Sequence, residues 1–173
     1  SSVLAARTVA TEVQEIVERE ALYAYAAQVG DAYVLQGRAP VYVIPFGSEG
    51  TRVAVRHVMR GGMAAKPLVD RFLPPTRILT ELMNAIRLRL GSVPTPDVLA
   101  LITYPAGGPF RRADVMTRYV EGADLAAVLG DPRNDAQRRP ILHAVARLLR
   151  QLGNTGAQHQ DLNLKNILIT ADD

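Results

Sequence analysis

Three short segments rich in β-branched and aromatic residues follow one another in the first third of the chain. They are Ala32–Leu35, Pro40–Phe46 and Arg52–Met59, and short turn-forming stretches separate them. Connections of this kind join neighbouring antiparallel strands. The sequence therefore predicts a three-stranded antiparallel meander.

A helix is expected before the meander and another after it. Few helix-breaking residues occur from Thr8 to about Gln28, and Gly30-Asp31 follows as a stop signal. Apolar residues recur at helical spacing from about Thr76 to Leu90. The remaining expected elements are two strands, a short helix and an amphipathic helix capped by Gly153, over Leu99–Tyr104, Ala113–Tyr119, Leu125–Leu129 and Pro140–Leu152. This order of elements predicts an α+β fold.

The composition excludes several classes of protein. The 173 residues are a usual size for one domain. The chain has no cysteine, which excludes disulfides and thiolate metal sites. No apolar run approaches the roughly 20 residues of a membrane span, and no secretory signal is visible at the N-terminus. We therefore expect a globular protein in a reducing compartment.

Basic residues outnumber acidic ones between Arg52 and Arg89, whereas residues 1–51 lean acidic. A local excess of positive charge attracts phosphate-bearing ligands or an anionic membrane surface. Nucleic acid is the other usual partner, but the chain has no Trp and few other aromatic residues. We therefore expect no nucleic-acid binding.

Residues 159–166, here called the octet, are His-Gln-Asp-Leu-Asn-Leu-Lys-Asn, and a short strand-like segment follows them. Kinase-type phosphotransferases use the spacing between Asp161 and Asn166 in their catalytic loop. There the Asp orients the acceptor hydroxyl and the Asn offers an oxygen to Mg²⁺. The octet therefore predicts phosphoryl transfer, with Asp161 as the base, Asn166 as a metal ligand and His159 packed beneath the loop. A polar turn whose side chains bond their own backbone is the simpler alternative.

Lys165 lies between the two functional residues of the octet. It is a candidate contact for the transferred phosphate, and exposure to solvent is its ordinary alternative. Asn163 stands where many protein kinases have a Lys. Related small-molecule kinases often have other residues there, so an amide is compatible with activity.

The strand Val53-Ala54-Val55-Arg56 is similar to the kinase strand V-A-I-K, whose Lys contacts nucleotide phosphates and a Glu of the next helix. Arg56 would take the place of that Lys, and Glu81 is the only acidic residue on the expected helix. Arg can pair with a carboxylate in a bidentate manner. The alternative is an exposed Arg and an exposed Glu, and Lys66 is a second candidate for the phosphate contact.

Three further positions are weaker candidates. Gly37 lies between the first two expected strands, where a phosphate-covering loop would lie, although only one glycine is present. Arg60-Gly61-Gly62 ends the third strand and could bring a chain close to an anionic ligand. Glu121 falls where a hinge between two lobes would meet adenine. An ordinary turn or strand end explains each of them as well.

The order of elements matches a protein-kinase-like fold, with an antiparallel-sheet small lobe and the beginning of a helical large lobe. The expected divisions are an N-terminal helix at 1–30, the small lobe at 31–121 and the start of the large lobe at 122–173. Fold alone is weak support for a function.

Several blocks of the sequence resemble the Kdo kinases, lipopolysaccharide kinases that phosphorylate a 3-deoxy-octulosonic acid sugar on lipid A precursors. The family pattern includes R-H-Y-x-R-G-G, D-x-Y/F, V-P-x-P and H-x-D-L-N-x-x-N-I-L. The matching blocks here are Gly37-Arg38, Val55–Gly62, Asp70–Leu73, Val93–Pro96 and His159–Leu168. Asp-Leu-Asn is more typical of this family than of protein kinases.

The resemblance implies transfer from ATP, with Mg²⁺, to a sugar hydroxyl at the cytoplasmic face of the bacterial inner membrane, where the protein would be peripheral. Arg56 with Glu81 would position the nucleotide. Arg60, Lys66 and Arg71 would meet the phosphorylated glycolipid acceptor or the anionic membrane.

Such kinases also need a second metal-binding Asp, in a D-F-G-like or D-F-D-like motif beyond the octet. Asp172 and Asp173 come too soon after Asn166, and no Phe follows them. The expectation is therefore an incomplete metal site, in a fragment or in a protein that binds without catalysis. A non-catalytic pseudokinase or binding module, or another small-molecule or protein kinase of the same fold, are the alternatives.

Overall fold

A computed structural model describes residues 1–173 except 37–38, 60–69, 74–75, 157–161 and 171–173, and the side chains of residues 76–79 and 81 also lie outside the description. The chain divides into two compact units. Unit 1 is Ser1–Glu81 with Pro96–Tyr119, and unit 2 is Leu82–Thr95 with Val120–Asp173.

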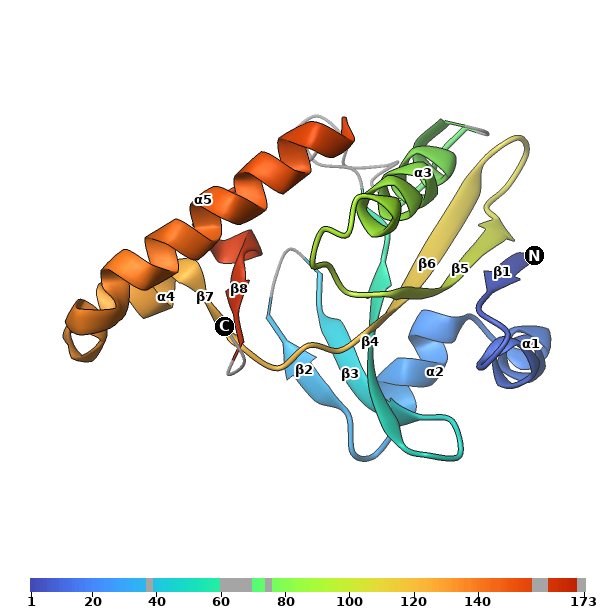
Figure 1. Ribbon diagram of the computed structural model, residues 1–173. Helices are drawn as coiled ribbons and strands as arrows, with labels where there is room; N and C mark the ends of the chain where they lie inside the picture. The colour runs from blue at the N-terminus through green and yellow to red at the C-terminus, as the bar shows by residue number, and fades with distance from the viewer. Residues whose placement is uncertain (37–38, 60–69, 74–75, 157–161, 171–173) are drawn as a thin grey trace. The chain divides into compact units, whose positions relative to one another are not determined.

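Unit 1 is built on a six-stranded sheet with the order β1-β5-β6-β4-β3-β2, in which all neighbours are antiparallel (Figure 1). The expected meander is confirmed as β2-β3-β4. Gly47 and Gly50 form the β3–β4 turn with positive φ angles, which glycine adopts without strain. The strands are β1 Ser2–Ala5, β2 Tyr33–Leu35, β3 Val41–Phe46, β4 Thr51–His57, β5 Val98–Pro105 and β6 Arg111–Arg118.

The single helix expected over 8–28 is wrong. The structure has two helices, α1 Ala10–Arg19 and α2 Leu22–Gln28, with an extended residue at Glu20. The break lets Val13 of α1 and Leu22 of α2 both enter the core, where each is fully buried. Packing against the sheet therefore overrides the helix propensity of the Glu20-Ala21 link.

Strand β1 was not expected, because its four residues are too few to show an alternating pattern. It adds to the edge of the sheet beside β5, with Val3 opposite Ile102. Helices α1 and α2 lie near one face of the sheet, and α2 contacts β3 and β4 (Figure 1). We call this the covered face. Its core contains Ile44, Val53, Val55, Ile102 and Met116.

Unit 2 contains the second part of α3 Thr76–Leu90, a helix whose expected bounds are confirmed. Helix α5 runs to Thr155, and Gly156, with φ of +64°, follows it as the cap. The expected cap at Gly153 is therefore wrong, since the left-handed position that ends the helix comes three residues later. The other elements of unit 2 are β7 Ala123–Asp124, α4 Leu125–Gly130, η1 Pro132–Gln137, α5 Arg138–Thr155, η2 Leu164–Asn166 and β8 Leu168–Ile169.

Among the described residues, none of the helices has the length and apolar character needed to cross a membrane.

Candidate functional site

Arg56 lies on the face of the sheet opposite the covered face. Successive residues of a strand point to opposite faces, so the buried Val55 and the partly buried His57 share the covered face, and Arg56 does not. Its cross-strand partners are Val41 on β3 and Val115 on β6. The side chain of Arg56 is exposed, as a ligand contact requires. The side chain of Glu81, its expected partner, lies outside the description.

On the covered face, His57 forms a network that the sequence analysis did not single out. Its Nδ1 lies 2.6 Å from Oδ1 of Asp114, and its Nε2 lies 3.7 Å from Oδ2 of Asp70. Asp70 in turn accepts Nε of Arg112 at 2.6 Å. An Asp amid the apolar residues of β6 was the available signal, because a carboxylate is rarely buried without partners.

Two tyrosines border this network. Burial raises the pKa of Tyr104 well above its usual value, and the charge of Asp114 adds to the rise, against a smaller opposing effect of the Leu22 amide, which donates to the Tyr104 hydroxyl at 2.9 Å. Burial and the neighbouring Tyr42 raise the pKa of Tyr23. The Tyr23 ring lies 5.1 Å from that of Tyr42 and 5.6 Å from that of His57, measured between centroids. Within the network only Asp114 is fully buried, and the side chains of His57, Asp70 and Arg112 are partly exposed.

In unit 2, the described part of the octet forms a single helical turn. The side chain of Asn163 accepts the amide of Lys165 at 2.9 Å, and the Asn163 carbonyl accepts the amide of Asn166 at 3.0 Å. Asn163 is therefore the cap of the turn η2, which presents Lys165 and Asn166 at the surface. His159 and Asp161 lie outside the described residues.

The strand after the octet is held in place by backbone contacts. The carbonyl of the buried Ile167 accepts the amide of Leu125 at 2.9 Å. Strand β8 then pairs with β7, with Ala123 opposite Ile169. A Cβ placed on Gly122 would lie 2.7 Å from the carbonyl oxygen of Ile169, so only glycine fits there. The chain that follows the octet is thus held by one continuous segment, residues 122–125.

The other predicted site residues are dispersed. Glu121 is exposed just before β7. Arg71 is half-buried beside Phe72, whose backbone bonds that of Arg111 in both directions at 2.8 Å. Gly37, Arg60 and Lys66 lie outside the described residues. The structure therefore brings Lys165 and Asn166 together in unit 2 and places Arg56 in unit 1.

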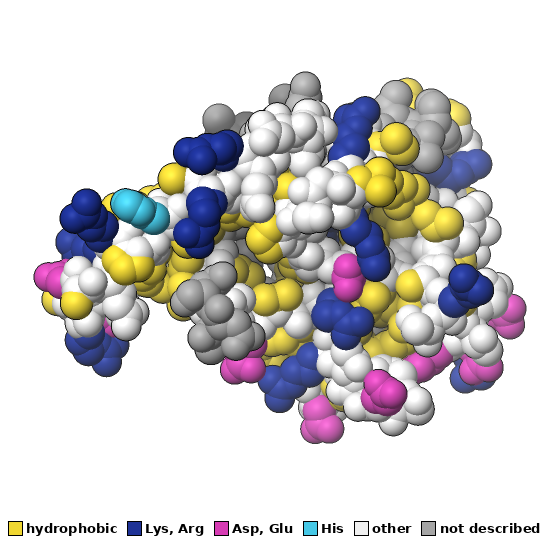
Figure 2. All heavy atoms as spheres, viewed as in Figure 1, with side chains coloured by type: hydrophobic (Ala, Val, Ile, Leu, Met, Phe, Trp, Pro, Cys, Tyr) yellow, Lys and Arg dark blue, Asp and Glu magenta, His cyan; other side chains and the backbone are white. Residues whose placement is uncertain are grey.

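Helix α5 is a further source of positive charge. It contains Arg138, Arg139, Arg147 and Arg150 and no acidic residue. On the face drawn in Figure 2, Lys and Arg side chains lie along this helix. A field of this kind would attract anionic molecules.

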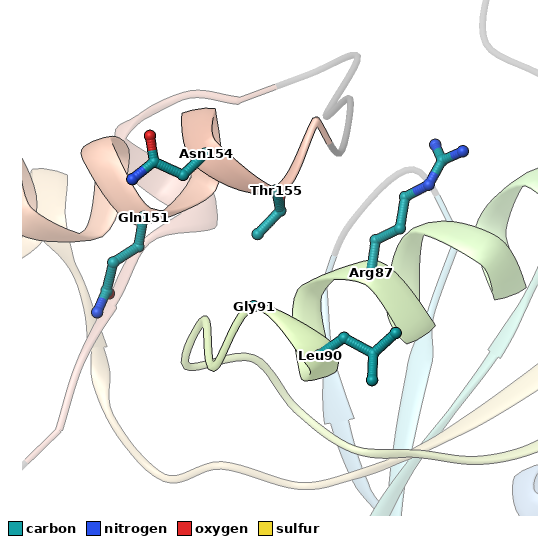
Figure 3. Close-up of a pocket in the computed structure, with 6 residues that line it drawn as sticks. All are labelled: Arg87, Leu90, Gly91, Gln151, Asn154 and Thr155. Atoms are coloured by element: carbon teal, nitrogen blue, oxygen red, sulfur yellow. The ribbon is translucent and has the colours of Figure 1, made fainter.

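A cavity of about 370 Å³ lies in unit 2 between the ends of α3 and α5 (Figure 3). None of its lining residues is a predicted site residue, and none is acidic: Arg87, Leu90, Gly91, Gln151, Asn154 and Thr155. In the described part of the chain no group of three or more His, Cys, Asp or Glu residues could hold a metal ion. Asn166 is the predicted metal ligand of this chain, and its side-chain oxygen is a suitable donor for Mg²⁺.

The family model described as "Lipopolysaccharide kinase (Kdo/WaaP) family" matches residues 37–173. The chain belongs to this family. A 3-deoxy-D-manno-octulosonic acid kinase of Actinobacillus succinogenes is 34% identical over 127 residues, covering 69% of this chain and 51% of that protein. The enzyme of the same name from Stenotrophomonas maltophilia is 34% identical over 142 residues, covering 76% and 52% respectively. The chain thus spans about half the length of the curated relatives it matches.

Solved structures confirm the kinase-like α+β fold. A structure of WaaP in complex with acyl carrier protein matches with a TM-score of 0.56 at 16% identity, covering 100% of this chain and 68% of that one. The kinase domain of maize SIRK1, a sucrose-induced receptor kinase, matches with a TM-score of 0.51 at 16% identity, covering 88% and 51%.

Proposed function

We propose that this chain provides the nucleotide-binding lobe and the catalytic loop of an ATP-dependent phosphotransferase, which phosphorylates a sugar hydroxyl of the Kdo unit in a lipid A precursor. Membership of the Kdo/WaaP family supports this proposal most strongly. The capped turn at the end of the octet supports it independently, because it presents Lys165 and Asn166 at the surface next to Asp161 in sequence.

Phosphoryl transfer depends on the position of the acceptor and on neutralisation of phosphate charge. Asp161 would accept or orient the proton of the attacking hydroxyl, and Lys165 would contact the transferred phosphate. Asn166 would bind Mg²⁺, which supplies charge neutralisation when it is bound.

The phosphates of the nucleotide would be held by residues of unit 1. Arg56 would contact its phosphates and pair with Glu81, and the turn at Gly37 would cover it. The backbone around Glu121 would meet the adenine. Arg60, Lys66 and Arg71 would bind the anionic glycolipid or the cytoplasmic surface of the inner membrane, where the protein would be peripheral. In this proposal, residues 1–30 are an N-terminal extension, residues 31–121 are the small lobe, and residues 122–173 begin the large lobe.

The test is a transfer assay with the full-length protein, ATP, Mg²⁺ and a Kdo-containing lipid A precursor. We expect phosphate on the sugar, and a loss of at least a hundredfold in kcat for Asp161→Ala. The exposed Asp31, outside the octet, supplies the matched control Asp31→Ala, which should retain activity. Full turnover by Asp161→Ala would overturn the catalytic assignment, and absence of transfer by the unmodified protein would favour a non-catalytic binding module.

A further inference from the structure

Asp114 is the one buried charged residue in the described part of the chain, with a side chain that is 1% exposed. A carboxylate is retained in such a place only when hydrogen bonds replace its hydration. Oδ1 meets Nδ1 of His57 at 2.6 Å, and Oδ2 accepts the amide of Tyr23 at 2.9 Å. One buried carboxylate therefore joins strand β6 to strand β4 and to helix α2.

The bond from Asp114 to His57 holds the C-terminal end of β4, where Arg56 precedes His57. The two residues are adjacent but point to opposite faces of the sheet. His57 is further enclosed by the Tyr23 ring and by Asp70, which Arg112 holds at 2.6 Å. A fixed side chain on the covered face thus limits rotation of the strand that directs Arg56 on the opposite face.

The N-terminal helices belong to this arrangement although the family match begins at residue 37. Leu22 and Tyr23, the first two residues of α2, donate their amides to Tyr104 and Asp114. The Tyr23 hydroxyl also donates to the carbonyl of Pro40 at 2.9 Å, next to β3. Helix α2 is therefore bonded to three segments of the sheet region.

We propose that Asp114 and His57 are positioning residues for Arg56, through which helix α2 sets the direction of Arg56 toward the nucleotide. The proposal rests on the proposed role of Arg56 as a phosphate contact. It assigns to residues before position 37 a part in nucleotide affinity, and it assigns to the His after Arg56 a role distinct from ligand contact.

The test compares Asp114→Ala, the conservative Asp114→Asn and His57→Ala in the full-length protein. Titration calorimetry with Mg²⁺-ATP gives the dissociation constant and the stoichiometry separately. We expect Asp114→Ala and His57→Ala to raise the dissociation constant at least tenfold at unchanged stoichiometry, and Asp114→Asn to retain part of the affinity. Val13→Ala is the matched control, because Val13 is fully buried in the core of the covered face but lies on α1, outside the bonds that join α2 to the sheet. It should lower the melting temperature without changing the dissociation constant.

Hydrogen exchange without nucleotide provides a second measurement. The two variants are compared at temperatures equally far below their own melting temperatures. Under these conditions the amides of Thr51–His57 and of the start of α2 should exchange faster in Asp114→Ala than in Val13→Ala. Local exchange and nucleotide affinity equal to those of Val13→Ala would overturn the proposal. A different result is faster exchange in β4 of Asp114→Ala together with no nucleotide binding by the unmodified protein. That result would support the coupling of α2 to β4 but would overturn the assignment of Arg56 as a phosphate contact.

Discussion

His57 and Asp114 occupy paired positions on the antiparallel strands β4 and β6, and their side chains meet at 2.6 Å on the face of the sheet that α2 covers. The pair is a polar contact at the edge of the otherwise apolar interface between α2 and the sheet. In the described residues, every buried side-chain nitrogen or oxygen atom has a hydrogen-bond partner.

Replacing Asp114 with Ala should lower the free energy of unfolding by about 2–4 kcal/mol. The change leaves the partly buried Tyr23 amide and His57 ring without the carboxylate that they contact. Urea denaturation measures the effect. Replacing the exposed Asp31 with Ala is the control and should change stability by less than about 0.5 kcal/mol. A loss that small for Asp114→Ala would show that water replaces the carboxylate.

Gly122→Ala should destabilise unit 2 by roughly 1–3 kcal/mol, because the new methyl group would overlap the Ile169 carbonyl and force β7 away from β8. Thermal unfolding reports the change. Gly130→Ala is the matched variant, since a Cβ there meets no atom within 4 Å, and it should be neutral or slightly stabilising at the end of α4. Equal melting temperatures for the two variants would contradict the close approach.

Tyr104 predicts a loss of stability in alkaline solution. Burial raises the pKa of Tyr104 in the folded protein, so the unfolded chain releases this proton first. Its contribution to stability is complete below about pH 10, the ordinary value, and is lost as the pH rises above it. Denaturation between about pH 9 and about pH 11 measures the slope, which should be shallower in Tyr104→Phe. An identical slope in both proteins would show that Tyr104 ionises as readily when folded.

Asn163→Ala should reduce phosphate transfer, because the turn that presents Lys165 and Asn166 loses its cap. Loss of a side-chain cap costs about 1 kcal/mol, which is enough to loosen so short a turn. Asp also caps well, so Asn163→Asp should restore most of the kcat that Asn163→Ala loses. If Asp and Ala at this position behave alike, the amide acts on the ligand rather than on the turn.

Much of the sheet was accessible from sequence, because β-branched runs and glycine turns mark β3 and β4 locally. The bounds of α3 were equally accessible from its apolar spacing. The break between α1 and α2 could not be predicted from sequence, since Glu20 and Ala21 are compatible with a continuous helix. Only packing against the sheet favours two separate helices. The His57–Asp114 pair depends on the register of two strands, which no local pattern specifies.

For the candidate site, the sequence predicted the chemistry of the octet but not how its C-terminal part is supported. The spacing of Asp161 and Asn166 is a chemical requirement, whereas the bond from Asn163 to Lys165 is a consequence of local backbone geometry. The roles of all the predicted site residues, Asp161, Lys165 and Asn166 included, stay predictions.

Strand β1 has a consequence for how the chain folds during synthesis. Ser2 pairs with Thr103, so the first strand meets its partner only after about a hundred further residues have been made. The amides of Leu22 and Tyr23 bond Tyr104 and Asp114, which lie 82 and 91 residues further along the chain. Contacts so distant in sequence make folding slow. Helices α1 and α2 therefore remain without the strands they bond until β5 and β6 have been made, and during that interval their apolar sides are exposed to chaperones.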